Sequence, residues 1–408
     1  MKIVMLVYDV ARKPLGNRTG YEAIALSEAG YEIRALTLEW DGGPAHEFHG
    51  GISIENVRVP LLNYNRKLRR FLCLPVIYYR LISRLLQEQY LVVYCQHPFL
   101  LPLAIFAGKV KGAKIVYDAY EMYSVQWSAR LKCAAGYIRH IIEGIENLLV
   151  RRADYVLTVD SRDGVLAGRY GKVAKVEVLY NVPELTKEIS NTSYKRRMSE
   201  IAEKYEGYRV IIYVGGVSYA KGAMQLIEST HVVKKDIPNV KLLVAGKFTD
   251  DSGQQIEKYV KKHELDDNYE FLGWLSHEDM SLYLKVAVIG VALHQPTRLY
   301  MLYPAKGTGR KFFTYMESGL PIVGPEFAEV GQVVREENCG ILVDTTKPED
   351  IAEAIVYLLN HTNEAKALGD NGRRAVEEKY NLAIEKKKVI RVFETLCDTR
   401  SRSCRGEI

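Results

Sequence analysis

An alternation of short apolar runs with helical patterns, which occurs twice, most constrains how this chain can fold. Between two apolar runs the apolar residues take helical spacing, and this rhythm is typical of parallel sheets with crossover helices. The 408 residues are enough for two domains that each bury a core. We therefore predict the α/β class, with two doubly wound, Rossmann-like parallel sheets that face a central cleft. The strand-like runs are 2–8, 32–38, 91–95, 114–117, 155–159 and 176–180, then 209–214, 240–245, 269–272, 287–293, 321–324 and 340–343.

The polar segment 183–207 separates the two series and reads as a linker with a charged helix. This places the first domain at 1–182 and the second at 208–382. A Lys-rich helical pattern covers 383–400, and we expect a tail over 401–408.

Composition limits the function further. Hydrophobic residues make up 48% and charged residues 26%, as in an ordinary soluble protein. The most apolar stretch, Tyr90–Gly108, is broken by two prolines and a Gln-His pair, and the first residues lack a signal-peptide pattern. The six cysteines show no metal or disulfide spacing, and His46 and His49 read as part of a solvated loop. We expect a cytoplasmic protein without a metal or other cofactor.

Positive charge is concentrated in the first domain, where residues 1–182 hold 24 Lys+Arg against 17 Asp+Glu. Segment 58–84 contains seven arginines and lysines and no acid, interleaved with aromatic and aliphatic residues. It could lie on an anionic membrane surface or grip a phosphorylated acceptor, and a solvated basic helix face is the alternative. No nucleic-acid-binding motif accompanies this charge.

Two glycine-rich basic loops in the second domain predict an anion site. The sequence YVGGVSYAKG (213–222) runs from a strand into a helix. In YPAKGTGRKFFTYMESGLPIVG (303–324) the glycine-rich basic loop comes first, a short helix follows, and an apolar strand ends the segment. Glycines allow close backbone approach, and a lysine at a helix start favours an anion. For a single loop of this kind, a tight turn would be the favoured interpretation, so the second loop matters. Neither loop has the Walker A or the dinucleotide spacing, which disfavours a kinase or a dehydrogenase.

With these loops in place, the chain resembles the retaining glycosyltransferases of family 4 (glycosyl transferases group 1), which have the GT-B fold. The resemblance covers nearly the whole chain and rests on motifs in order: YDAYEMYS (117–124), VLYNVPE (178–184), YVGG with KG (213–222), FLGWLS (271–276) and KFFTYMESGLPIV (311–323). It implies a nucleotide-sugar donor, UDP- or GDP-linked, on the second domain and a glycan or glycolipid acceptor on the first. It also implies that the helix 383–400 crosses back to the first domain, and that no metal is needed.

The resemblance implies roles for particular residues. Catalytic roles fall on Tyr120, Glu121 and Lys221, of which Lys221 is the leading candidate to stabilise the departing diphosphate. The donor contacts are Gly215, Gly216, Lys221, Trp274, Leu275, Gly309, Arg310, Lys311 and Thr314. The acceptor-side residues are Gly16, Arg18, His97 and Asp118.

Several positions depart from the family pattern. Gly216 stands where an arginine is common, Tyr120 where a histidine is usual, and Lys306 and Thr314 where two glutamates are expected. A carboxylate holds ribose hydroxyls more strongly than a threonine hydroxyl does.

These departures leave three interpretations. The chain is an active transferase in the synthesis of cell-surface polysaccharide or glycolipid, working at a membrane face. Alternatively it is a non-catalytic sugar-nucleotide-binding subunit, or a GT-B-fold sugar-nucleotide epimerase. The basic patch of the first domain favours the transferase over the epimerase.

Overall fold

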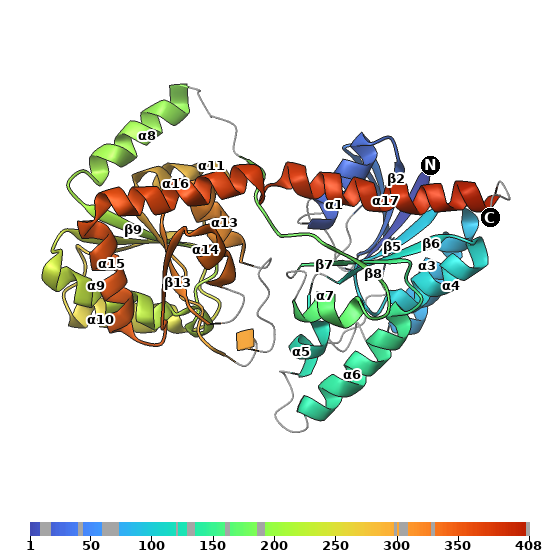
Figure 1. The fold of residues 1–408 in the computed structure, drawn as a ribbon, viewed down its shortest axis with the longest axis horizontal. Coiled ribbons are helices and arrows are strands. Elements are labelled where there is room, and N and C mark those ends of the chain that lie inside the picture. Colours follow the sequence, from blue (N-terminus) through green and yellow to red (C-terminus); the bar gives the residue numbers. More distant parts are fainter. Residues whose placement is uncertain are drawn as a thin grey trace. The chain divides into compact units, whose positions relative to one another are not determined.

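A computed structural model divides the chain into two compact units (Figure 1). Unit 1 is Met1–Tyr180 with Ala383–Ile408, and unit 2 is Asn181–Leu382. The structure describes residues 1–8, 18–39, 44–58, 73–119, 121–128, 135–159, 164–185, 192–297, 300–301, 309–327 and 331–404.

Unit 1 is built on an eight-stranded sheet with the order β3-β4-β2-β1-β5-β6-β7-β8. All neighbours are parallel except β3 and β4, which form an antiparallel hairpin at one edge. The strands are β1 (Lys2–Val7), β2 (Glu32–Glu39), β3 (His46–His49), β4 (Ile52–Arg58), β5 (Val92–Cys95), β6 (Lys114–Ala119), β7 (Tyr155–Thr158) and β8 (Lys175–Val178).

Helices cover both faces of this sheet. The crossovers α3, α4 and α6 share one face, and α4 contacts both of the others (Figure 1). The opposite face carries α1 and α17. The helices are α1 (Arg18–Glu28), α3 (Leu74–Gln87), α4 (Leu101–Lys111), α5 (Tyr123–Ser128), α6 (Ala135–Val150), α7 (Val165–Tyr170) and α17 (Leu382–Cys404).

Unit 2 has a six-stranded parallel sheet with the order β11-β10-β9-β12-β13-β14. The order reverses beside β9, so the carboxyl ends of β9 and β12 flank the topological switch point, where folds of this kind bind ligands. The strands are β9 (Arg209–Val214), β10 (Val240–Ala245), β11 (Tyr269–Gly273), β12 (Ile289–Val291), β13 (Ile322–Pro325) and β14 (Gly340–Val343).

The helices of unit 2 begin where local chemistry favours it. Ser276 caps α11 by accepting a hydrogen bond from the Asp279 N–H at 3.0 Å. Pro348 opens α15, and two acidic residues follow in the first turn. The helices are α8 (Thr192–Lys204), the 3₁₀ turn η1 (Tyr219–Lys221), α9 (Ala223–Asp236), α10 (Ser252–Lys262), α11 (His277–Val286), α13 (Arg310–Glu317), α14 (Gln332–Glu337), α15 (Pro348–Asn360) and α16 (Thr362–Glu378).

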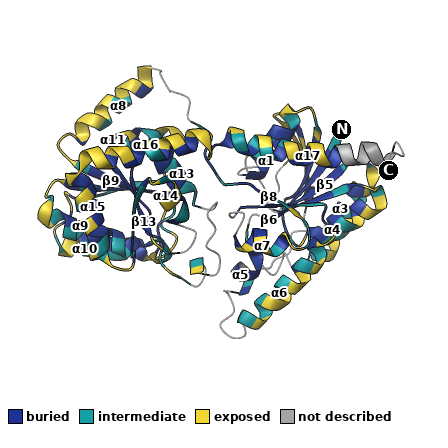
Figure 2. Ribbon diagram, viewed as in Figure 1, coloured by how far each residue is buried: buried dark blue, intermediate teal, exposed yellow. Residues whose placement is uncertain are grey.

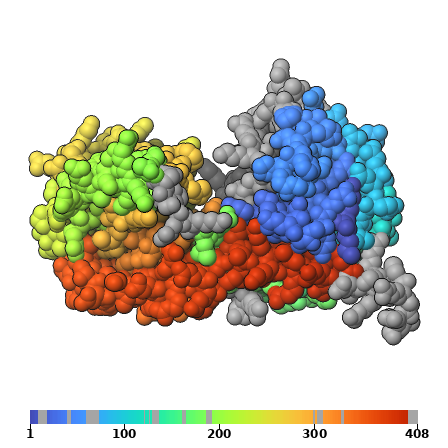
Figure 3. Space-filling model, turned by 90° about the horizontal axis from the view of Figure 1, so that it is seen from above, coloured from blue at the N-terminus to red at the C-terminus, as the bar shows by residue number. Residues whose placement is uncertain are grey.

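Each sheet lies at the centre of its own hydrophobic core, and the strands are buried while the outer helix faces are exposed (Figure 2). The core of unit 1 includes side chains of α17, which pack with α1 against the first strands. Figure 3 shows α17 lying along the N-terminal segment, and Lys386 pairs there with Glu28 at 3.1 Å. The last helix of the chain therefore completes the first unit.

Some sequence predictions need correction. The segment around His46 and His49 is not a loop, because it forms the exposed strand β3 of a hairpin that the predictions missed. Gly50 and Gly51 both have positive φ in the two-residue turn, which is why glycines stand there. The segment 183–207 carries the predicted charged helix as α8, but α8 packs on α11 and belongs to unit 2 rather than to a separate linker. Helix α17 continues to Cys404, four residues into the predicted tail.

Candidate functional site

Three glycines bring neighbouring loops together at the carboxyl edge of the second sheet. Gly215 follows β9 with φ +105°, a conformation that L side chains rarely adopt. A Cβ on Gly246, after β10, would come within 1.8 Å of the Gly215 carbonyl oxygen, and the Gly246 N–H donates to the carbonyl of Gly273, the last residue of β11, at 2.7 Å. Glycine is therefore required for this close approach, and it leaves the backbone around Gly215 exposed.

Two predicted donor-side lysines converge on this backbone. The Nζ of Lys221 lies 3.0 Å from the position that a Cβ on Gly216 would take. Lys311, in the first turn of α13, donates from Nζ to the Tyr213 hydroxyl at 2.7 Å and lies over the Tyr213 ring. Its Cε is 3.9 Å from the Cβ position of Gly215. Residues 90 positions apart in the sequence thus place two ammonium groups beside one glycine pair.

The positive charge of this pair is not balanced by acid. Among the described residues no carboxylate forms an ion pair with Lys221 or Lys311. Burial lowers the pKa of Lys221, and burial together with the Lys221 charge holds the pKa of Lys311 well below its ordinary value. Both residues keep part of their surface exposed, so an anion can reach them. A bound dianion would reverse these pKa shifts.

His294, which the predictions missed, belongs to the same cluster. It follows β12, it is buried, and its Nδ1 has no hydrogen-bond partner in the part of the chain that the structure describes. Burial and the charges of Lys311 and Lys221 hold the pKa of His294 well below its usual value, so the ring is neutral. The signal in the sequence was a histidine directly after a buried strand at the switch point.

Gln295 fixes the turn that carries Lys221. Its side chain donates to the carbonyls of Leu293 and Thr345, and its N–H donates to the Ala220 carbonyl at 2.9 Å. A Cβ on Gly222 would come within 2.3 Å of the Leu293 carbonyl oxygen, so the turn packs directly on the end of β12. We term Lys221, Lys311 and His294, with Gly215 and Gly216, the lysine site.

Other predicted donor residues lie on α13 or along the same sheet edge. Arg310 and Thr314 are half-buried on α13, where the Thr314 hydroxyl donates to the Arg310 carbonyl at 3.2 Å. Gly309 precedes them, and a Cβ there would meet the Phe312 ring at 2.6 Å. The loop after β11 carries Trp274 and Leu275. The Trp274 side chain is 67% exposed, with Lys247 Nζ 5.7 Å from its ring centroid.

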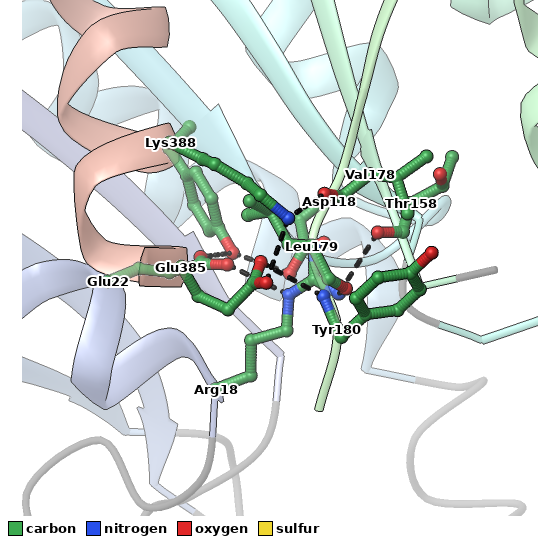
Figure 4. A network of polar contacts seen from close by, with 10 residues as sticks. Arg18, Glu22, Asp118, Thr158, Val178, Leu179, Tyr180, Glu385 and Lys388 are labelled. Carbon is green, nitrogen blue, oxygen red and sulfur yellow. Dashed lines mark hydrogen bonds and ion pairs between the residues drawn. The ribbon is translucent and has the colours of Figure 1, made fainter. Parts of the chain in front are cut away.

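In the first unit, two predicted acceptor-side residues are instead joined in a buried network (Figure 4). The Arg18 guanidinium pairs with Asp118 at 2.9 Å and with Glu22 at 2.8 Å. It also donates to the carbonyls of Thr158 and Leu179, at 3.3 and 2.9 Å. Arg18 and Asp118 therefore bind each other and tie α1 to β6, to β7 and to the residue that follows β8, rather than presenting free polar groups outward.

The network continues through Tyr94 and the last helix. The Tyr94 hydroxyl lies 2.6 Å from Glu22 and 2.7 Å from Asp118. Burial raises the pKa of Asp118 to about 7, against the opposing charge of Arg18. Beside Arg18, Glu385 of α17 accepts from the Tyr180 N–H at 3.1 Å and from Lys388 at 2.8 Å. Every charge in this group has an opposite partner.

His97, also predicted on the acceptor side, lies in an aromatic cluster at the carboxyl edge of the first sheet. Its ring stacks on Tyr8 with centroids 4.2 Å apart and is 4.4 Å from Tyr123. Phe99 and Trp127 stack on each other at 4.7 Å and complete the cluster. His97 Nδ1 accepts from the Phe99 N–H at 3.2 Å, so this histidine is held by its neighbours.

One more residue predicted in the first unit, Glu121, lies within the described part of the chain. Glu121 is half-buried just before α5. Tyr120, Gly16, Lys306 and residues 59–72 of the basic segment lie outside the described residues. Within the described residues, no group of three His, Cys, Asp or Glu side chains could hold a metal ion. None of the described helices has the length and hydropathy that a membrane span needs.

Family comparisons match both units. The sequence model of Glycosyltransferase Family 4 matches residues 16–185, and that of Glycosyl transferases group 1 matches residues 195–375. An uncharacterized glycosyltransferase of Methanocaldococcus jannaschii is 22% identical over 72% of this chain and 71% of its own. A capsular polysaccharide biosynthesis glycosyltransferase of Staphylococcus aureus is 22% identical over 73% of this chain and 77% of its own.

Solved structures show the same fold. Sucrose-phosphate synthase from Thermosynechococcus elongatus superposes with a TM-score of 0.70 at 17% identity, over 97% of this chain and 99% of that one. HepE of Anabaena, in complex with UDP, gives a TM-score of 0.67 at 14% identity, over 97% and 100%. The predicted GT-B fold of two Rossmann-like units is thereby confirmed.

Proposed function

Because this chain belongs to the group 1 glycosyltransferases of family 4, we propose that it transfers a sugar from a UDP- or GDP-linked donor to a glycan or lipid-linked acceptor with retention at the anomeric carbon. The observation that carries the proposal is the lysine site, with two ammonium groups that no described carboxylate balances.

The geometry suits a leaving diphosphate. The acceptor oxygen bonds to the anomeric carbon, the bond from that carbon to the phosphate oxygen breaks, and the proton of the acceptor hydroxyl passes to water. The diphosphate gains one negative charge in this step. Lys221 and Lys311 are already held beside the exposed Gly215 backbone, so the charge can be stabilised without rearrangement. We infer that this lysine pair takes the role that a divalent metal plays elsewhere.

The acceptor side follows from the first unit. We assign acceptor contact to the aromatic cluster of His97, to Glu121 and to Tyr120, since the carboxyl edge of a doubly wound sheet is where ligands bind. Arg18 and Asp118 then act as positioning residues through their buried network. The relative from S. aureus, named for capsular polysaccharide biosynthesis, supports a cell-surface glycan pathway. We further propose a cytoplasmic enzyme that works at a membrane, with the basic segment 58–84 facing the lipid.

The test is a product assay with a panel of UDP- and GDP-sugars, comparing the wild type with Lys221→Ala. We expect transfer to fall by about 10²–10³-fold, as when a transition-state charge partner is removed. Lys366→Ala is the matched control, because Lys366 is an exposed lysine on α16 of the same unit. Unchanged transfer by Lys221→Ala would refute the assigned role.

One observation favours a second candidate, a non-catalytic sugar-nucleotide-binding subunit. Thr314 stands where a ribose-binding carboxylate is expected, and its hydroxyl is already bonded to the Arg310 carbonyl. Nucleotide binding in a thermal-shift screen, with neither transfer nor hydrolysis for any donor, would decide for this candidate. An epimerase would instead give product without an acceptor.

A further inference from the structure

Helix α6 carries a row of large apolar side chains that face solvent. Tyr137, Ile141, Ile145 and Leu148 follow one another at intervals of four, four and three residues, so they lie on one side of the helix. Their exposed fractions run from 46% to 72%. Figure 2 shows α6 exposed along its length. A surface helix normally turns such a row inward, so this row is an unpartnered face.

The neighbouring helices extend this face. On α4, Phe106 and Val110 are one turn apart and exposed, and on α3, Val76, Tyr79 and Leu86 are exposed on one side. Helix α4 contacts both α3 and α6, so the three lie side by side over the same face of the sheet (Figure 1). We call the outward side of α3, α4 and α6 the three-helix face.

The charge of the three-helix face has one sign. Helix α3 has Arg80 and Arg84 and no acid, and α4 has Lys109 and Lys111 and no acid. Arg84 pairs with the buried Glu55 of β4, which Arg34 also neutralises, so Arg80, Lys109 and Lys111 carry the positive charge of the face. The only acids in these three described helices are Glu143 and Glu146 of α6. Both are engaged inward or along the helix: Glu146 is buried and bonded to Tyr117 and Arg169, while Glu143 pairs with Arg139 and accepts from Ser124.

From this combination we propose that the three-helix face docks on an anionic lipid bilayer, with α6 lying in the interface and its apolar row entering the boundary between headgroups and acyl chains. Apolar side chains in one row, flanked by basic residues without free acid, fit such a surface. The alternative occupant, a second copy of this chain, would bring like charges together, which disfavours it. The proposal deepens the proposed function, since it brings a lipid-linked acceptor to unit 1, but its test does not use activity.

The experiment measures binding of the full chain to sedimented vesicles. Vesicles of phosphatidylcholine alone are compared with vesicles that also contain phosphatidylglycerol. We expect binding only to the second kind, weakened by salt. The double variant Ile145→Glu/Leu148→Glu should reduce the partition coefficient about tenfold or more, because two apolar anchors are lost and two negative charges are added. Phe48→Glu, at an exposed aromatic on β3 that belongs to none of these three helices, is the matched control and should bind as the wild type does.

A second variant and a second measurement separate the outcomes. Lys109→Glu changes only the charge of the face and should reduce binding less than the double variant does. A thermal unfolding midpoint equal to that of the wild type shows that each variant is folded. Failure of the wild type to bind phosphatidylglycerol vesicles, or equal binding by the double variant, overturns the proposal. A dimer in sedimentation velocity that the double variant abolishes would also overturn it in favour of a second copy. Sugar transfer to a soluble acceptor is measured separately for the double variant. Transfer that persists while vesicle binding is lost would show that the membrane proposal and the proposed function are tested independently.

Discussion

The two units treat buried charge in opposite ways. In unit 1 the Arg18 guanidinium is buried against two carboxylates and two backbone carbonyls. In unit 2 the Lys311 ammonium donates to a tyrosine hydroxyl, and the charge of Lys221 acts against it. A cation that is matched by acids inside the protein supports the fold, whereas a cation that no acid matches is available to a ligand from outside. The contrast thus distinguishes residues that support the fold from residues for which we propose a binding role.

The largest expected effect is a loss of stability when Arg18, the cation that two carboxylates balance in unit 1, is removed. Arg18→Met leaves Glu22 and Asp118 buried without a cation, so unfolding free energy should fall by about 3–5 kcal/mol. Denaturant unfolding measures it. The exposed Arg152→Met is the control. Nucleotide binding by unit 2 at a temperature where the variant is folded should be unchanged, and a change there would mean that Arg18 has a role in the donor site.

Removing Lys311, the cation that no described carboxylate balances in unit 2, should lower the affinity for a nucleoside diphosphate rather than the stability of the fold. Lys311→Met removes a cation that burial already disfavours, so the protein should be as stable as the wild type or more so. Nucleoside diphosphate affinity should fall about tenfold or more, as for a lost hydrogen bond to a charged group. Calorimetry and thermal unfolding measure the two quantities. A less stable Lys311→Met variant with unchanged nucleotide affinity would show that Lys311 supports the fold, as Arg18 does, and would contradict the contrast between the two units.

The lowered pKa of Lys311 predicts how stability depends on pH. Above the lowered pKa the folded protein holds fewer protons on Lys311 than the unfolded chain does. Stability of the ligand-free protein should therefore rise with pH from this lowered pKa towards 10.5, the ordinary lysine value. Lys311→Met should lose this part of the slope. A bound diphosphate raises the pKa again, so binding in this window should take up protons, which calorimetry in buffers of different ionisation enthalpy detects.

The smallest effect is a gain. Thr314→Glu restores the carboxylate of the family pattern on α13, and a ribose hydroxyl would then donate to a charged acceptor. Nucleotide affinity should rise a few-fold, corresponding to about 1 kcal/mol. Ser318→Glu, one turn further along and exposed, is the control. No gain would mean that this chain holds its ribose by other groups.

Regular elements were largely predictable from the sequence because their signals are local. The runs at 240–245 and 340–343 match β10 and β14 in both bounds. The β3-β4 hairpin was missed because a search for strand-helix alternation passes over two strands joined by Gly50-Gly51, although a Gly-Gly turn between alternating runs is itself a hairpin signal.

The sites were less predictable because their contacts are distant in sequence. Arg18 meets Asp118 across 100 residues, and no local pattern shows that the pair is internal. The charge of Lys311 at a helix start was visible, but its bond to Tyr213 and its burial depend on how β9 and α13 pack. His294 had a local signal, its place after a buried strand, but its proximity to Lys221 and Lys311 depends on the same packing.

The position of α17 has a consequence for how the protein is made. Unit 2 is inserted into unit 1, and the ends of the insert are tied, because the Leu382 N–H donates to the Pro183 carbonyl and Glu385 holds Tyr180. During synthesis, residues 1–180 leave the ribosome long before Val389, Val392 and Phe393 exist to cover their apolar surface. The first unit therefore cannot complete its core until unit 2 and α17 have been translated, whereas unit 2 can fold before α17 is made. Chaperones that shield apolar surface should therefore matter most for the half of the chain that is made first.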